Sequence, residues 1–291
     1  MRTSVSRFLL AVAASHFLAG CVQGTLHERK ASFYALSHGE AGLAPTKDFL
    51  TSRTAVLISG QHLAVSPSAT NTEVFHFNAE SPRFETGCAT PVDRRGYFLT
   101  AAHAVGKEPP WLVFGPGNKL QAERAHVVWR GVVTNGEPDL ALLWVPCPLG
   151  EVFEWASDFK AGDRVIGVGA NQRPPSLDFQ VVCFTGTLRE SGSKSEAEGG
   201  RCAVFHTAPL HKGDSGGPLV ALDGRLIGIN VRCTKVFALL HPLGKRLNCA
   251  EHPSLSWLSE LIEGHAGAQN RASAQRPNPA PETTAAAGQT R

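Results

Sequence analysis

The 291 residues include 42% apolar and 18% charged side chains, which is enough apolar material for one large or two small cores and too little charge for a disordered protein. The 28 basic and 25 acidic residues are spread along the chain and leave a net charge of +3, without the basic stripe that phosphate recognition requires. Nucleic acid is therefore not an expected partner. Beyond the first 20 residues there is no apolar run long enough to predict a membrane-spanning helix.

Residues 1–20 have the layout of a secretion signal. Arg2 and Arg7 form a short positive region, residues 8–17 form an apolar one, and small residues precede Cys21. This order of positive, apolar and small residues is typical of a leader that is removed on export. We therefore expect the mature chain to begin near Cys21 and to enter a compartment outside the cytoplasm.

The residues around the expected cleavage point also carry a lipid-attachment pattern. The segment Leu18-Ala19-Gly20-Cys21 resembles the bacterial lipobox, which implies that Cys21 becomes the first mature residue and carries acyl chains. Such chains would hold the protein on a membrane of the bacterial cell envelope. Val22 follows the Cys where inner-membrane retention is associated with Asp, so the resemblance favours the outer membrane. An ordinary cleaved signal with an incidental Cys is the alternative.

Six cysteines remain after Cys21, an even number in a chain expected to enter an oxidising compartment, which predicts disulfides. We expect cysteines on neighbouring strand-like runs, or flanking a short excursion, to pair locally. The expected bridges are Cys183–Cys202, Cys233–Cys249 and, by elimination, Cys88–Cys147. A metal site is the alternative, but no Cys-x-x-Cys or His-x(3–5)-His cluster supports one. No metal or other cofactor is therefore expected.

The mature chain is predicted to be mostly β-structure after a tether over residues 21–50. Short runs rich in β-branched, apolar and aromatic residues alternate with Gly, Pro, Asn and Asp, a rhythm typical of antiparallel all-β folds. A first series of predicted strands covers residues 54–65, 73–78, 85–92, 96–102, 111–115, 124–131 and 140–146. A second series covers residues 164–170, 179–189, 201–207, 216–222 and 225–232.

A Pro- and Gly-containing connection separates the two series, which predicts two six-stranded antiparallel barrels over about 51–146 and 160–250. Leucine and isoleucine then recur at helical spacing after Pro253, so a short closing helix is expected over residues 254–263. The whole folded domain is predicted to span residues 51–264. The composition of residues 265–291 cannot form a core, so we expect a disordered tail.

Three motifs have the residue types needed for nucleophilic catalysis. Ser215 lies in Gly213-Asp214-Ser215-Gly216-Gly217, between small residues that leave its hydroxyl accessible. Because a serine hydroxyl is a weak acid, it needs an imidazole base that is oriented by a carboxylate. His103 ends an apolar run and Asp139 begins Asp-Leu-Ala-Leu-Leu, and the three residues follow one another at separations of 36 and 76.

The motifs, their order and their spacing resemble the trypsin/chymotrypsin-fold serine proteases over about residues 54–263. Gly96-Tyr97-Phe98-Leu99-Thr100 before the His, the Asp139 motif and Gly228-Ile229-Asn230 are more similar to HtrA-type bacterial proteases than to digestive trypsins. The resemblance implies a chymotrypsin-like fold with His103 and Asp139 in the first barrel and Ser215 in the second. No PDZ module fits in the C-terminal tail, so regulation through such a domain is not implied.

The same resemblance implies a serine endopeptidase acting on peptide bonds of cell-envelope proteins. Ser215 would attack the carbonyl carbon and form an acyl-enzyme, His103 would carry the proton, and Asp139 would fix the imidazole tautomer. The backbone N–H groups of Gly213 and Ser215 would bind the negative oxygen of the intermediate. A protein or peptide is the expected substrate.

Other interpretations remain open at this point. Each motif taken alone also fits a structural role: a Gly-Asp-Ser turn, a core histidine, or a polar residue that begins a buried strand. The intact set of three argues against a trypsin-fold binding protein without turnover, which is one alternative function. An esterase that uses the same three residues is another.

Two departures from the family pattern concern the site itself. No Ile-Val-Gly-Gly-like sequence precedes the first barrel, so Asp214 needs a partner other than a freed N-terminal amine. Pro209 stands where trypsins that cut after Lys or Arg have an acidic residue, so cleavage after basic residues is disfavoured. A small apolar residue before the scissile bond is favoured, or an acidic one if Arg232 and His206 turn into the pocket.

Overall fold

The computed structural model describes residues 22–26, 32–34, 47–62, 64–67, 75–79, 84–115, 121–135, 137–173, 178–193, 202–234 and 247–274. The predicted signal peptide at residues 1–20 and the predicted lipid site at Cys21 lie outside these ranges. None of the helices in the described ranges combines the length and the apolar character that a membrane crossing requires.

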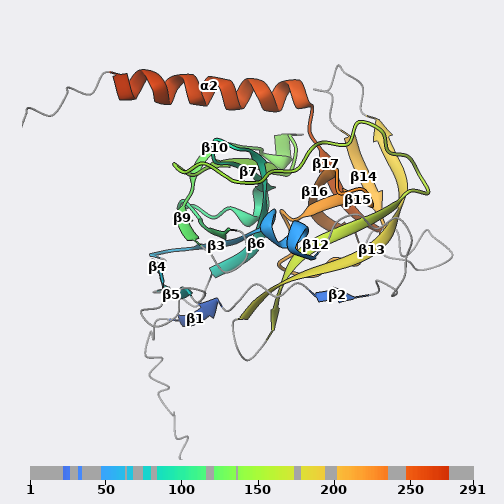
Figure 1. The fold of residues 1–291 in the computed structure, drawn as a ribbon, viewed down its shortest axis with the longest axis horizontal. Coiled ribbons are helices and arrows are strands. Elements are labelled where there is room, and N and C mark those ends of the chain that lie inside the picture. The colour runs from blue at the N-terminus through green and yellow to red at the C-terminus, as the bar shows by residue number, and fades with distance from the viewer. Residues whose placement is uncertain are drawn as a thin grey trace, which may run out of the picture.

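The N-terminal lobe is a curled antiparallel sheet of seven strands in the order β10-β11-β7-β6-β3-β8-β9 (Figure 1). Its strands are β3 (Ala55–Gly60), β6 (Phe84–Asp93), β7 (Tyr97–Ala101), β8 (Trp111–Phe114), β9 (Gln121–Arg124), β10 (His126–Arg130) and β11 (Leu140–Trp144). All residues of β7 and most of β3 and β11 are buried, so these central strands appear in the sequence as nearly continuous apolar runs.

The C-terminal lobe is a closed six-stranded barrel. Its strands are β12 (Arg164–Arg173), β13 (Asp178–Ser193), β14 (Cys202–His206), β15 (Pro218–Ala221), β16 (Leu226–Thr234) and β17 (Leu247–His252). The order β12-β15-β16-β17-β14-β13 closes on itself because β12 also pairs with β13. This barrel and the sheet of the other lobe lie next to each other in Figure 1.

Short elements occur before the first large sheet, within the segment that was expected to be only a tether. β2 (Ser32–Tyr34) pairs in parallel with β13, and α1 (Lys47–Ser52) leads into β3. A separate three-stranded sheet combines β1 (Val22–Leu26), β5 (Phe75–Ala79) and β4 (Ala64–Pro67). Two single 3-10 turns, η1 (Ala102–Ala104) and η2 (Val133–Asn135), lie between strands of the N-terminal lobe.

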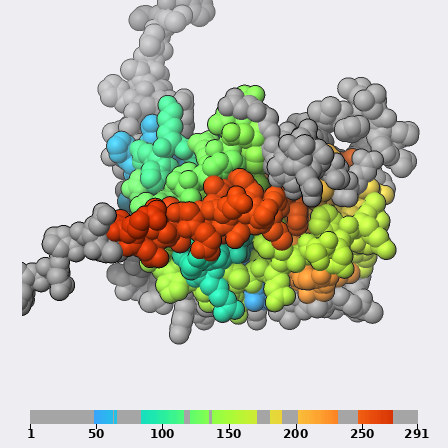
Figure 2. Space-filling view, turned by 90° about the horizontal axis from the view of Figure 1, so that it is seen from above, coloured from blue at the N-terminus to red at the C-terminus, as the bar shows by residue number. Residues whose placement is uncertain are grey.

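The C-terminal helix α2 (Leu255–Ala274) is twice as long as the predicted helix. It extends across the N-terminal lobe, in full view in Figure 2, and the ring of Trp257 packs edge-on against Trp129 of β10 at 4.8 Å. His265 makes a second contact between α2 and the N-terminal lobe, since its Nδ1 lies 2.9 Å from the hydroxyl of Tyr97 in β7. The prediction that disorder begins at residue 265 is therefore wrong for residues 265–274, whose Ala, Gln and Arg favour helix.

The predicted all-β class with a C-terminal helix is confirmed, and most predicted strands are present. The N-terminal sheet differs in detail, since it has seven strands and the described residues contain no pairing that closes it. The pattern missed β9, Gln-Ala-Glu-Arg, and β17, Leu-Asn-Cys-Ala-Glu-His. Neither segment has the alternating β-branched residues that mark a strand in sequence, and both are held by pairing with neighbours.

The expected disulfides are wrong, because none of Cys88, Cys147, Cys183, Cys202 and Cys249 forms a disulfide in the described part of the chain. Strand register explains the failure of the first bridge. Cys202 lies opposite Ser193 on β13, whereas Cys183 lies ten positions earlier on that strand, about 30 Å away along the chain. A disulfide requires Cα atoms within about 7 Å.

The other two bridges fail for similar reasons. Cys249 is opposite Arg232, and Cys233 is opposite Asn248, so the two cysteines are not directly opposite each other in the register of β16 and β17. Cys88 is buried beside the carbonyl of Gly213, whereas Cys147 lies in a loop near the side chain of Gln121.

We predict that these five thiols react with an alkylating reagent when the protein is unfolded without reductant. In the folded protein Cys147 and Cys202 should react first, because they are half-buried whereas the other three cysteines are buried. Mass spectrometry of peptides labelled before and after unfolding measures this difference. A pair of these cysteines that stays unlabelled until reductant is added would contradict the register described here.

Candidate active site

His103 and Asp139 are brought together by the pairing of β7 with β11. Leu140 is opposite Ala101, so the residue just before β11 meets the residues just after β7. The N–H of Ala102 donates to the carbonyl of Asp139 at 3.1 Å, and η1 then turns His103 back toward the carboxylate. The two side chains are therefore placed by strand register, 36 residues apart in sequence.

The Asp139 carboxylate holds the imidazole at two points. Its Oδ1 accepts a hydrogen bond from the backbone N–H of His103 at 3.0 Å, and its Oδ2 lies 2.8 Å from His103 Nδ1. Asp139 is 6% exposed, whereas half of the His103 side chain is open to solvent. A carboxylate at Nδ1 favours the tautomer with the proton on that nitrogen, which leaves the lone pair on Nε2.

Ser215 lies in the C-terminal lobe, in the segment between β14 and β15. Its Oγ lies 3.0 Å from His103 Nε2, which is hydrogen-bonding distance for a serine and its base. The turn that carries it depends on two glycines with positive φ, Gly213 at 100° and Gly216 at 89°. A Cβ at Gly216 would overlap the carbonyl oxygen of Cys88, so only glycine permits this approach. All three residues predicted to be catalytic thus meet in one place.

The N-terminal sheet holds the serine turn through β6, a role that the sequence did not reveal. The N–H of Cys88 donates to the carbonyl of Ser215 at 2.7 Å, and the hydroxyl of Thr90 donates to the carbonyl of Gly216 at 2.9 Å. The hydroxyl of Thr100 in turn donates to the carbonyl of Cys88 at 2.6 Å. These side chains are too ordinary in sequence to be singled out, since their role comes from the contact between lobes.

The predicted oxyanion donors lie in the same turn. Within the described ranges, the backbone N–H groups of Gly213 and Ser215 have no hydrogen-bond acceptor, whereas Asp214 N–H donates to the carbonyl of His211 and Gly217 N–H to that of Asp214. Gly213 and Ser215 therefore have donors available for an incoming oxygen. The positive φ of Gly213 produces the turn that exposes them.

Asp214 is buried, and its partner lies in the same turn. Its Oδ2 accepts from the backbone N–H of His211 at 2.7 Å, and the His211 ring nitrogen lies 3.7 Å away. A Cβ at Gly169 of β12 would overlap the carboxylate, so this glycine makes room for it. Burial raises the pKa of Asp214 to about 6, although the backbone and charge of His211 oppose the shift.

The residues expected around the primary pocket are only partly described. His206 is fully buried in β14, and burial lowers its pKa to about 4, which keeps the ring neutral. Asn248 is opposite it on β17 and donates to the carbonyl of Ala208 at 2.5 Å. Asn230 is also buried, and the side chain of Arg232 lies outside the described part. None of the three described polar side chains is acidic.

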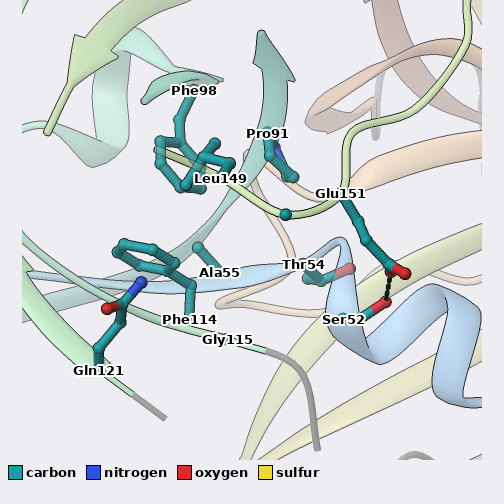
Figure 3. A pocket seen from close by; sticks show the side chains of 11 residues that line it. Ser52, Thr54, Ala55, Pro91, Phe98, Phe114, Gly115, Gln121, Leu149 and Glu151 are labelled. Atoms are coloured by element: carbon teal, nitrogen blue, oxygen red, sulfur yellow. Dashed lines mark hydrogen bonds between the residues drawn. The ribbon is translucent and has the colours of Figure 1, made fainter. Parts of the chain in front are cut away.

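A separate pocket lies away from these groups, between α1, β3, β8 and the loop at Leu149 (Figure 3). Phe98 and Phe114 form its apolar wall, and the hydroxyl of Ser52 donates to Glu151 at 2.7 Å on its rim. It contains none of the three residues predicted to be catalytic. In the described part of the chain, no group of three or more His, Cys, Asp or Glu side chains has a geometry suited to a metal ion.

Comparison with known proteins identifies a family model over the same region. The model of the trypsin-like peptidase domain matches residues 86–229, which include His103, Asp139 and Ser215. Among curated proteins, a DegP-like periplasmic serine endoprotease from Marinomonas sp. (strain MWYL1) is 26% identical over 199 residues, 64% of this chain and 40% of its own length. The serine protease HTRA1B of Danio rerio is 27% identical over 175 residues, 57% of this chain and 34% of its own.

Solved structures give a similar but more distant match. The serine endoprotease of Yersinia pestis aligns with a TM-score of 0.48 at 18% identity, over 74% of this chain and 63% of its own. The Rv3671c protease of M. tuberculosis in its active form aligns with a TM-score of 0.47 at 18% identity, over 76% and 87% of the two chains. This chain spans two fifths or less of the length of the curated relatives that it matches.

We predict that Asp214→Asn stabilises the protein at neutral pH but not in acid. A carboxyl whose pKa is raised from 3.8 to about 6 in the folded state binds its proton more tightly when folded, so ionising it costs stability as the pH rises through that window. The cost amounts to about 2 to 3 kcal/mol above pH 7. Asn keeps an oxygen for the His211 N–H but carries no charge.

Denaturant unfolding of both proteins at pH 4 and pH 7.5 measures this effect. Taking the difference between the proteins at each pH cancels the contribution of other titrating groups such as His206. A stability difference that does not change between the two pH values would show that Asp214 has no raised pKa.

Proposed function

The chain belongs to the trypsin-like peptidase domain family, and we propose that it is a serine endopeptidase that hydrolyses peptide bonds through Ser215, His103 and Asp139. The observation that carries this proposal is the continuous chain of contacts among them. Ser215 Oγ lies 3.0 Å from His103 Nε2, and His103 Nδ1 lies 2.8 Å from the carboxylate of Asp139. Relatives described as serine proteases of the HtrA and DegP type support the same activity.

The reaction proceeds in two steps on these residues. In the first, Ser215 Oγ attacks the substrate carbonyl carbon while His103 Nε2 takes the hydroxyl proton and then gives it to the leaving amine, which breaks the C–N bond and leaves an acyl-enzyme. In the second, water attacks the acyl carbon while His103 takes a proton from it and then gives that proton to Ser215 Oγ, which breaks the ester C–O bond and releases the carboxylic acid product. Asp139 stays ionised and stabilises the imidazolium that forms in each step.

Charge builds up on the substrate oxygen in both steps. The backbone N–H groups of Gly213 and Ser215 are the proposed donors, and they belong to the turn that is held from the other lobe by Cys88 and Thr90. A donor set fixed before the substrate arrives needs no reorganisation during reaction, and losing one donor costs about two to three powers of ten in rate.

The residues near the expected primary pocket favour an uncharged or small side chain before the scissile bond. His206 is turned inward and neutral, and Asn248 is bonded to the carbonyl of Ala208. A Lys or Arg would be desolvated there without an acidic partner among these residues, which is unfavourable. An acidic residue before the scissile bond would require His206 to become protonated.

The proposed place of action is the bacterial cell envelope. A relative described as periplasmic and DegP-like supports it, as does the layout of residues 1–20. We propose that acyl chains on Cys21 hold the enzyme on a membrane, with the outer membrane favoured by Val22. Substrates would then be proteins of the envelope.

We predict that Ser215→Ala and His103→Ala each lower kcat/KM on a peptide library by at least about 10³-fold, because the three residues act as a unit. Asp139→Asn should cause a smaller loss of kcat/KM, because the serine and its base remain. Ser259→Ala, on an exposed turn of α2, is the matched control and should leave turnover unchanged. All variants should unfold at a similar denaturant concentration.

Three outcomes would contradict the endopeptidase proposal. Undiminished peptidase activity in Ser215→Ala would exclude Ser215 as the nucleophile. Hydrolysis of esters but never of peptides by the wild type would indicate an esterase, and a folded wild type without any turnover would indicate a binding protein.

We predict that Cys21→Ala releases the protein from membranes while leaving its peptidase activity intact. The lipid is the proposed attachment and lies before the folded lobes in sequence, so its loss should not affect the site. Fractionation measures the release from membranes, metabolic labelling with a fatty-acid analogue measures acylation, and a peptidase assay of the released protein measures activity. Equal labelling of wild type and variant would exclude lipidation at Cys21.

A further inference from the structure

Glu251 of β17 contacts the catalytic region from the barrel that does not carry His103 or Asp139. Its Oε1 accepts a hydrogen bond from the backbone N–H of Asp139 at 3.0 Å, across a sequence separation of 112 residues. Glu251 belongs to a strand that the sequence pattern missed, and it is not one of the three residues predicted to be catalytic. The contact joins the closed barrel directly to the residue that orients the imidazole.

This bond completes the hydrogen bonding of Asp139. Its carbonyl accepts from Ala102 N–H at 3.1 Å, its Oδ1 from His103 N–H at 3.0 Å, and its Oδ2 lies 2.8 Å from the His103 ring. Those three contacts come from one segment of the N-terminal lobe, and among the described residues the N–H is the one group of Asp139 with a hydrogen bond to the other lobe. Because Asp139 is 6% exposed, water is a poor substitute for Glu251, and a lost acceptor would leave a buried donor unpaired.

The same two strands of the barrel also hold the serine turn. Glu251 is opposite Ile229 of β16. The next residue of β16 is Asn230. Its backbone carbonyl accepts a hydrogen bond from Gly216 N–H at 2.7 Å, and its backbone N–H donates to the carbonyl of Gly217 at 2.9 Å. The pair β16 and β17 therefore contacts Asp139 through Glu251 and the turn of Ser215 through Asn230. His103 lies between the two ends of this connection.

We propose that Glu251 is a positioning residue that fixes the Asp139 peptide relative to the barrel that carries Ser215, so that His103 is held in line with the serine. This inference rests on the serine endopeptidase function proposed above. The proposed role involves no proton transfer, because the contact that carries it is to a backbone amide that keeps its proton throughout. Its effect is on the alignment of the three residues, which governs the chemical steps more than substrate binding.

Two substitutions separate this role from a general contribution to stability. Glu251→Gln keeps a side-chain oxygen at the same length and so retains the acceptor for Asp139 N–H. Glu251→Met has nearly the same length and shape but no comparable acceptor. Glu260→Met, on the exposed face of α2, is the matched control for replacing a glutamate by Met.

For Glu251→Met we expect kcat to fall by about 10- to 100-fold with KM changed by less than about twofold. Glu251→Gln should restore most of kcat, and Glu260→Met should behave as wild type. Equal kcat in Glu251→Met and wild type would overturn the proposal, as would equal losses in the Gln and Met variants. Proportional rises in KM would likewise show that Glu251 acts on binding.

Amide hydrogen exchange in the wild type and in Glu251→Gln provides a measurement that does not depend on the Met variant folding. The Asp139 N–H should be protected in both, and fast exchange in the wild type would also overturn the proposal. The results distinguish a failure of the proposed endopeptidase function from a failure of the role proposed for Glu251. An inactive, folded wild type would exclude the endopeptidase, whereas an active wild type with a fully active Glu251→Met would exclude only the role of Glu251.

Discussion

The hydrogen bond from Cys88 N–H to the carbonyl of Ser215, 2.7 Å long, joins the two lobes at the point where their chemistry must meet. The serine is carried by one sheet, and the histidine and aspartate by another. A hydroxyl and an imidazole can react only if they stay within hydrogen-bonding distance, and a displacement of about 1 Å can cost two powers of ten in rate. The fold must therefore fix two separate sheets relative to each other with the accuracy of a single hydrogen bond.

Two kinds of interaction share this task. Apolar packing supplies most of the cohesion, since one cluster of buried side chains continues from the N-terminal sheet into the closed barrel, with Leu99 and Leu142 from the first and Ile229 and Val231 from the second. Such packing is not directional. The buried hydroxyls of Thr90 and Thr100 bond to the carbonyls of Gly216 and Cys88, and these directional contacts set the register between lobes.

The sequence predicted the fold class and the three residues of the proposed active site more fully than it predicted the contacts that hold them together. Ser215, His103 and Asp139 are recognisable because their chemistry demands rare combinations of residue type and spacing. Thr90 and Glu251 are not recognisable, since each acts by meeting a backbone group more than 100 residues away. β17 was missed for a related reason, because pairing with β14 and β16 forms it, without an alternating apolar pattern. Register likewise overturned the expected cysteine pairs, which cannot be deduced from spacing.

The central claim is that Ser215 is an activated nucleophile, and covalent labelling by a serine-directed phosphonate tests it most directly. The folded wild-type protein is incubated with the reagent, and the adduct is located by mass spectrometry of its peptides. The account predicts one adduct, on Ser215, which is absent from Ser215→Ala and forms far more slowly in His103→Ala. A folded protein that forms no adduct, or one labelled at a different serine, would contradict it.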